Sequence, residues 1–152
     1  MVIRLAKQDD VRLLQDLNDK IFIDNPKYDI DLKMDWAQSD IGKNYFRKVI
    51  RNPNSICLIA EKNDMAIGFI TAASKDFDYR LSKYIEIEIM GVLPNHCFKG
   101  VGSKLIRKCL KMAKEKNFQR VYVNSYIDNV KAINFYETNG FKKIDISLEK
   151  DI

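Results

Sequence analysis

The sequence predicts an α/β (α+β) domain in which one mixed β-sheet carries helices on both faces. Stretches in which apolar and polar residues alternate, the period of a strand, are interleaved with stretches whose apolar residues recur at helical spacing. Along the chain they give the order βααβββαβαβ, and Tyr84 to Met112 joins a strand to a helix through a glycine-containing loop. At 152 residues the chain has the length of one domain with its own core, so residues 1–152 are expected to form a single domain.

The chain is expected to begin with a strand and two helices. Val2 to Ala6 forms the strand. The first helix has its apolar residues at helical spacing: Val11, Leu14, Leu17 and Ile21. After an acid-rich segment, Asp24 to Asp40, Ser39 is a suitable N-cap for the second helix. That helix is expected to bury four side chains: Ile41, Tyr45, Phe46 and Val49.

Five further elements surround the central unit. Ser55 to Glu61 and Met65 to Ala73 have the alternation of a hairpin and precede it. After it, Arg120 to Tyr126 is expected to be a strand, and Asn129 to Thr138 a helix. Phe141 to Leu148 alternates again and is expected to close the sheet as the last strand.

The central unit itself combines an alternating strand with an anion-binding loop. Two sets of strand residues are expected on opposite faces: Ile85, Ile87 and Ile89 against Glu86, Glu88 and Met90. Gly100 and Gly102 then stand at the mouth of the helix. Glycines there let backbone N–H groups approach an anion, and the helix dipole favours negative charge at the same place.

The loop differs from two common phosphate-binding loops and resembles a third. Leu105 stands where the dinucleotide fingerprint requires another glycine, and no GxxxxGK[ST] is present. The run resembles motif A of the GNAT superfamily of acyl-CoA-dependent N-acetyltransferases, in which a strand ends in Val-x-Pro and Q/R-x-x-G-x-G/A opens a helix. The residues that carry this resemblance are Val92, Pro94, Lys99, Gly100, Val101, Gly102, Ser103, Lys104 and Leu105. Cys97 departs from it, because it stands at the Gln or Arg position, and Phe98 stands where glycine is frequent.

A second segment resembles the same family. Asn129 to Phe141 matches the pattern N-x-x-A-x-x-x-Y-x-x-x-G-F, with every marked position filled. The resemblance is strongest from Tyr84 to Phe141, and the earlier residues match mainly by the order of their elements. It implies the GNAT fold, a central mixed twisted sheet of six to seven strands flanked by about four helices.

The resemblance also implies acetyl-CoA as acyl donor and a set of residues that bind it. These residues are Met90, Val92, Cys97, Phe98, Lys99, Gly100, Val101, Gly102, Ser103, Asn129, Phe135 and Tyr136. Tyr136 is in addition the candidate general acid for the departing thiolate. No metal is expected, because the chain has a single histidine and its three cysteines have no metal-ligand spacing.

Acetyl transfer to an amine also needs a group that removes a proton, since a lysine-like amine has a pKa of about 10.4. Glu86 and Glu88 are the candidates for this catalytic role, directly or through water. Glu88 lies nearer the expected thioester site and ranks first. The alternative is that both are solvated carboxylates that merely attract a cationic substrate.

Two functions follow, an N-acetyltransferase acting by direct attack in a ternary complex and a CoA-binding module with little or no catalysis. Cys97 is the argument for the second. The net charge of +5 lies largely on the central helix, either as a solvated face or as an attraction for a polyanionic cofactor. The expected partners are acetyl-CoA and an unidentified amine. Neither nucleic acid nor a membrane is expected, the widely spaced cysteines favour a cytoplasmic location, and the chain is expected to be a monomer or homodimer.

Overall fold

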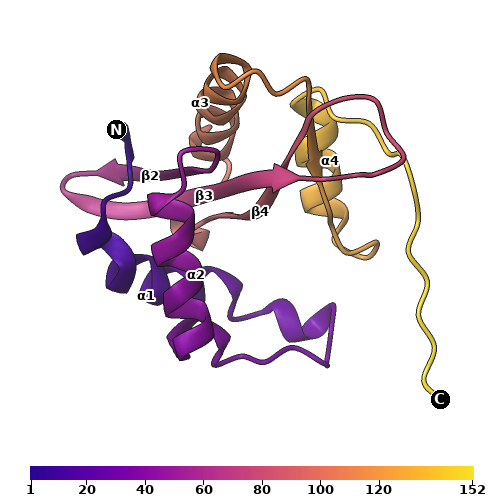
Figure 1. Cartoon of the computed structure of the whole chain (residues 1–152). Helices are drawn as coiled ribbons and strands as arrows, with labels where there is room; N and C mark the ends of the chain where they lie inside the picture. Colours follow the sequence, from indigo (N-terminus) through magenta and orange to yellow (C-terminus); the bar gives the residue numbers. More distant parts are fainter.

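A five-stranded sheet with strand order β1-β2-β3-β4-β5 forms the centre of the computed structural model, which describes residues 1–152 (Figure 1). β1 to β4 pair antiparallel, and β5 pairs parallel to β4, so the sheet is mixed as expected. The strands are β1 (Val2–Leu5), β2 (Ile56–Lys62), β3 (Met65–Lys75), β4 (Tyr84–Val92) and β5 (Arg120–Val123).

Helices cover both faces of this sheet, which confirms the expected fold class. α3 lies on one side, and α1 and α2 lie on the other (Figure 1). The helices are α1 (Val11–Phe22), α2 (Asp40–Arg51), α3 (Val101–Glu115) and α4 (Val130–Thr138). None of them is both long and apolar enough to cross a bilayer.

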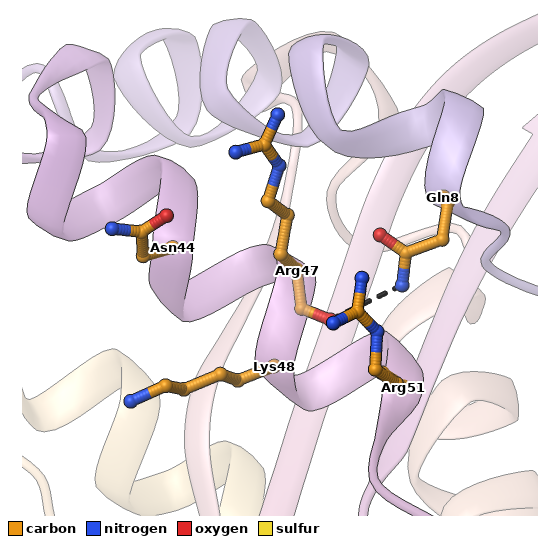
Figure 2. Close-up of a pocket in the computed structure, with 5 residues that line it drawn as sticks. All are labelled: Gln8, Asn44, Arg47, Lys48 and Arg51. Carbon is orange, nitrogen blue, oxygen red and sulfur yellow. Dashed lines mark hydrogen bonds between the residues drawn. The ribbon is translucent and has the colours of Figure 1, made fainter.

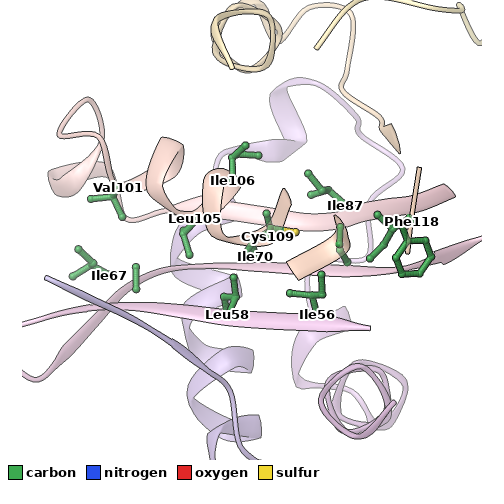
Figure 3. Close-up of a cluster of buried hydrophobic side chains, with 14 residues drawn as sticks. Ile56, Leu58, Ile67, Ile70, Ile87, Val101, Leu105, Ile106, Cys109 and Phe118 are labelled. Atoms are coloured by element: carbon green, nitrogen blue, oxygen red, sulfur yellow. The ribbon is translucent and has the colours of Figure 1, made fainter. Parts of the chain in front are cut away.

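Two hydrophobic cores lie on opposite faces of the sheet. The larger one, core 1, has 14 buried residues between the strands and α3, among them Leu58, Ile70, Ile87, Leu105 and Cys109 (Figure 3). Core 2 has eight buried residues between α1, α2 and the other face: Val11, Leu14, Leu17, Phe46, Val49, Cys57, Ile59 and Phe69. α4 contributes two half-buried aromatic rings to core 1, which brings it beside α3.

α2 begins where the sequence predicts but buries a slightly different face. The Ser39 hydroxyl accepts a hydrogen bond from the Gly42 N–H at 3.2 Å, as an N-cap should. Gly42 itself faces inward, and a Cβ there would lie 2.2 Å from the Trp36 carbonyl oxygen. The buried positions are therefore Gly42, Phe46 and Val49, and Ile41, which was expected inside, is 69% exposed.

β4 contains a β-bulge that the sequence does not predict. Thr71 of β3 pairs with Ile89 and Ala72 pairs with Ile87, so Glu88 is the extra residue. An extra residue exchanges the faces of everything beyond it. Ile89 accordingly packs against core 2 and Met90 against core 1, which makes the expected alternation correct up to Glu88 and wrong beyond it.

The predicted last strand is wrong, and the sheet has five strands instead of six to seven. Residues 141–152 form no strand, and after α4 the chain runs away from the sheet (Figure 1). Three alternating apolar side chains there remain largely exposed: Ile144, Ile146 and Leu148. Alternation makes a segment suitable for a sheet edge, but a strand also needs a partner. β5 has only four residues, which is shorter than expected and offers little edge to pair with.

Candidate active site

The N-terminus of α3 is open to a ligand. No side chain caps the helix, and its first hydrogen bond runs from the Lys104 N–H to the Gly100 carbonyl oxygen at 3.1 Å. The N–H groups of Val101, Gly102 and Ser103 therefore lack partners within the helix and are suited to an anion. Gly100 adopts φ +76°, a conformation that favours glycine.

Gly102 is in contact with two other predicted cofactor residues. A Cβ at this position would lie 3.0 Å from Phe135 Cζ and 3.3 Å from Met90 Cε. α4 therefore approaches α3 closely over Gly102, and a side chain there would require Phe135 to shift by at least a few tenths of an ångström. Val101 faces inward, with 4% of its surface exposed, so only its backbone is available to a ligand.

The loop before α3 differs from the family pattern in its side chains. The Cys97 thiol lies 3.5 Å from both the Val92 and the Leu93 carbonyl oxygens, so it is turned toward the end of β4. Phe98 adopts φ +60° and is 94% exposed. This left-handed conformation explains why glycine is frequent at the position. The Lys99 ammonium donates to the Asn95 carbonyl oxygen at 2.9 Å, within the same loop.

Tyr136 lies on the core 1 side of β4. Its hydroxyl is 4.0 Å from Met90 Sδ, and its ring packs edge-on against Phe135 and Phe141. Burial raises the pKa of Tyr136 to about 12, so its hydroxyl remains protonated at neutral pH. Asn129, at the N-terminus of the same helix, accepts from the Ala132 N–H at 3.2 Å through its side-chain oxygen. That contact makes Asn129 the N-cap and leaves its amide nitrogen free.

Glu88 and Glu86 lie on the other face of β4 in different surroundings. Glu88 is exposed, and its Oε2 accepts a hydrogen bond of 2.6 Å from the Tyr45 hydroxyl of α2. Glu86 is half-buried, and its Oε2 lies 3.5 Å from the ammonium of Lys75. Because Lys75 forms an ion pair with Glu86, Glu88 is the one of the two carboxylates without a cationic partner.

β5 pairs with only the first part of β4. The strands pair only over Tyr84–Ile87 and Arg120–Val123, and β4 continues to Val92 without a neighbour on that side. Glu88 stands at the first unpaired position on one face, and Met90, in contact with Tyr136, lies on the other. The structure therefore places a carboxylate and a phenol on opposite faces of β4, near the point where its pairing with β5 ends.

Tyr45 and Thr71 are the residues that sequence reasoning missed. Tyr45 was expected only as a core residue, and Thr71 as part of a hairpin strand. The Tyr45 hydroxyl lies 2.8 Å from Thr71 Oγ1, in addition to its contact with Glu88. Burial, and secondarily the hydrogen bond to Glu88, raise the pKa of Tyr45 above its usual value.

The acid-rich segment contacts the loop between β5 and α4. Tyr28 stacks on Tyr126 with 6.0 Å between ring centroids, and the Tyr126 hydroxyl donates to Asp29 at 3.0 Å. The segment thus touches the loop that leads to Asn129. No group of three or more His, Cys, Asp or Glu side chains is arranged to hold a metal ion.

Two surface hollows contain no candidate catalytic residue. One, of about 570 Å³, is lined by Gln8, Asn44, Arg47, Lys48 and Arg51 (Figure 2). The other, of about 330 Å³, runs along α3 and is lined by Ile3, Lys104, Arg107, Lys108 and Lys111. Both hollows are strongly basic, and neither is lined by Glu88 or Tyr136.

Comparison with known proteins identifies the family. The sequence model of the acetyltransferase (GNAT) family matches residues 13–141. The chain belongs to the GNAT acetyltransferase family. An uncharacterized N-acetyltransferase of Archaeoglobus fulgidus is 28% identical over 102 residues, which cover 66% of this chain and 69% of that protein. Human N-acetyltransferase 8B is 26% identical over 114 residues, or 75% of this chain, and the chain spans only 48% of its length.

Solved structures show the same GNAT fold at low identity. An aminoglycoside 6'-N-acetyltransferase from Acinetobacter haemolyticus superposes with a TM-score of 0.77, at 19% identity, over 100% of this chain and 99% of that one. Aminoglycoside N-acetyltransferase AAC(6')-Iy, solved in complex with CoA, gives a TM-score of 0.79 at 17% identity over 99% and 93% of the two chains. A transcriptional regulator from Bacillus halodurans gives 0.75 at 19% identity over 99% of both chains. At these identities the likeness concerns the fold alone.

Proposed function

We propose that this GNAT protein transfers the acetyl group of acetyl-CoA to a primary amine by direct attack in a ternary complex. The observation that carries the proposal is the pair Glu88 and Tyr136, one on each side of β4 where β5 leaves it. Membership of the family and the CoA complex of a protein with the same fold support acetyl-CoA as donor.

The cofactor residues have distinct roles in this proposal. Acetyl-CoA supplies the activated acetyl thioester when bound. The free N–H groups at the start of α3 bind its phosphates, and the Cys97 thiol, which is turned toward the end of β4, takes no part. Asn129 and Phe135, together with the backbone from Met90 to Val92, which has no strand neighbour on the β5 side, are the proposed contacts of its pantetheine arm.

Glu88 is the proposed base and Tyr136 the proposed acid. Glu88 takes the proton of the attacking amine, because it is the exposed carboxylate and has no ion-pair partner. Glu86 stays paired with Lys75 and contributes negative charge to the same face. Tyr136 keeps its proton at neutral pH and donates it, or a hydrogen bond, to the departing sulfur.

The same proposal extends to the domain organisation, the path of the amine and the location of the protein. Residues 1–152 form one domain, since both cores are built on the same sheet. The amine enters beside the acid-rich segment, over the face that holds Glu88. The three cysteines are free, in keeping with a cytoplasmic location.

A panel assay tests the proposal against the alternative of a non-catalytic CoA-binding module. The release of free thiol from acetyl-CoA is measured with a diamine, an aminosugar and a lysine peptide. Amine-dependent release that falls in Tyr136→Phe and Glu88→Gln supports an acetyltransferase. A rise in melting temperature with acetyl-CoA, but no thiol release with any amine, would establish the binding module instead.

A further inference from the structure

Glu88 accepts a hydrogen bond from the Tyr45 hydroxyl of α2, which in turn contacts the Thr71 hydroxyl of β3, and we propose that Tyr45 and Thr71 position its carboxylate for deprotonation of the amine. The inference rests on the proposed function, because it gives a purpose to contacts around the proposed base. Tyr45 and Thr71 would act through Glu88 and contact no reacting atom themselves.

The chemistry of the groups fixes the direction of the hydrogen bonds. An ionised carboxylate can only accept, so the Tyr45 hydroxyl donates to Glu88 Oε2 at 2.6 Å. Its oxygen is then free to accept from the Thr71 hydroxyl at 2.8 Å. Thr71 Oγ1 in turn accepts from the Ile89 N–H at 3.2 Å. The result is a chain of donors that starts at the backbone and ends on the carboxylate.

The bulge explains why such support is needed. Glu88 is the extra residue of β4, so no ladder pairing across β3 fixes the direction of its side chain. The Ile89 N–H next to it, which loses its regular partner at a bulge, is satisfied by Thr71 instead. Thr71 is fully buried, and Tyr45 packs against Trp36 with 5.4 Å between ring centroids, so both hydroxyls are held by packed side chains.

The arrangement also assigns different tasks to the two carboxylate oxygens. Oε2 is occupied by Tyr45, and Oε1 makes no hydrogen bond or ion pair within the chain. Oε1 is therefore the oxygen that can receive a proton, and Tyr45 can keep its hydrogen bond to Oε2 after that transfer. Glu86 lacks such a hydroxyl partner and is held by an ammonium group, which competes for the same negative charge.

A double-mutant cycle tests this role. Tyr45→Phe removes one hydroxyl and keeps the ring that packs on Trp36 and Phe46. With the fastest acceptor of the amine panel, it should lower kcat about tenfold and change KM less than about twofold, because hydrogen bonds to charged groups are among the stronger ones. Tyr45→Phe/Glu88→Gln should be no slower than Glu88→Gln alone, because Tyr45 acts only through that carboxylate. Tyr79→Phe, which removes a hydroxyl from an exposed ring, is the control and should stay within about twofold of wild type.

Thr71 supplies a second, independent comparison. Thr71→Ser keeps the hydroxyl and should retain kcat within about threefold, whereas Thr71→Val, of similar shape, should match the loss in Tyr45→Phe. Melting temperatures of all variants establish that each is folded at the assay temperature. Equal activity of the serine and valine variants would overturn the role of Thr71.

The possible failures are distinguishable. Losses of Tyr45→Phe and Glu88→Gln that multiply in an active enzyme overturn the positioning role and leave the proposed function intact. A wild-type chain without turnover refutes the proposed function and this role with it. The same cycle measured by thermal unfolding reports the Tyr45–Glu88 contact without any activity, and additive effects there would refute the contact itself.

Discussion

Replacing Gly102 with valine tests the packing of the cofactor loop and its binding role together. A Cβ at this position would already lie 3.0 and 3.1 Å from two ring carbons of Phe135 and 3.3 Å from Met90 Cε. Such a Cβ already requires its neighbours to shift by a few tenths of an ångström, and valine adds two further methyl groups. Phe135 must therefore move, and α4 must move with it or lose its contact with α3.

The expected loss of stability follows from that overlap. Forcing extra methyl groups into a packed site destabilises a protein by about 1–3 kcal/mol. For a domain of this size each kcal/mol lowers the melting temperature by roughly 2–4 °C, so Gly102→Val should melt about 2–12 °C below wild type. A displaced Phe135 also obstructs the proposed pantetheine path, so the stabilisation by acetyl-CoA should disappear. For wild type that stabilisation is about 2.7 kcal/mol at a ligand concentration of 100 Kd.

Differential scanning fluorimetry with and without acetyl-CoA measures both effects. Phe135→Leu, which removes the ring carbons that collide, should restore part of the stability when combined with Gly102→Val. A Gly102→Val variant that melts like wild type would refute the packing of α4 over Gly102. A variant that melts lower yet keeps the full acetyl-CoA shift would refute the assignment of this loop to the cofactor.

Three further outcomes are expected. Tyr136→Phe should lower kcat at least about tenfold with little change in acetyl-CoA affinity, because only the proposed proton donor is lost. Stopped-assay kinetics measure kcat, and calorimetry measures the affinity. Wild-type turnover in this variant would show that Tyr136 has a packing role and no catalytic one. Phe98→Gly should stabilise the chain by up to about 1 kcal/mol. Phe98 holds a strained left-handed φ of +60° while its side chain is 94% exposed, and glycine adopts that φ without strain. An unchanged or lower midpoint of unfolding in urea would contradict this. Arg4 holds the pKa of the Asp10 carboxyl below its usual value, so this pair stabilises the fold above about pH 4 and the effect is lost as pH falls through the lowered pKa. Asp10→Asn should therefore lower the melting temperature at pH 7 and approach wild type in acid, and a deficit that does not depend on pH would show that the ion pair is not its cause.

Local patterns predicted most of the elements, because they depend on near neighbours in the sequence. The N-cap at Ser39 and the buried face of α1 follow directly from residue type and spacing. Family motifs then indicated which of these elements surround the cofactor. The register of β4 could not be predicted from the sequence, because the extra residue at Glu88 depends on how β4 pairs with Thr71 and Ala72 of β3.

Two other features depend on contacts that no local pattern encodes. The residues from Phe141 to Leu148 alternate like a strand, yet strand formation requires a free edge of sufficient length, and β5 supplies only four residues. The sequence predicts Tyr45 to be a core aromatic residue, because its spacing on α2 is that of the buried face. Its hydrogen bond to Glu88 joins residues 43 positions apart, and only the folded chain reveals it.

The pH dependence of Glu88→Gln is the most direct test of the proposed mechanism, in which this carboxylate takes the amine proton. Glutamine keeps the shape of the side chain and removes its charge. With one amine as acceptor, kcat/KM should be lowered near neutral pH, and the deficit should shrink as pH rises toward the amine's own pKa of about 10.4. Glu86→Gln, which removes a carboxylate already paired with Lys75, should do less across the same range. A Glu88→Gln profile that stays parallel to wild type, with only a salt-sensitive rise in KM, would show that Glu88 attracts the substrate and is not the base.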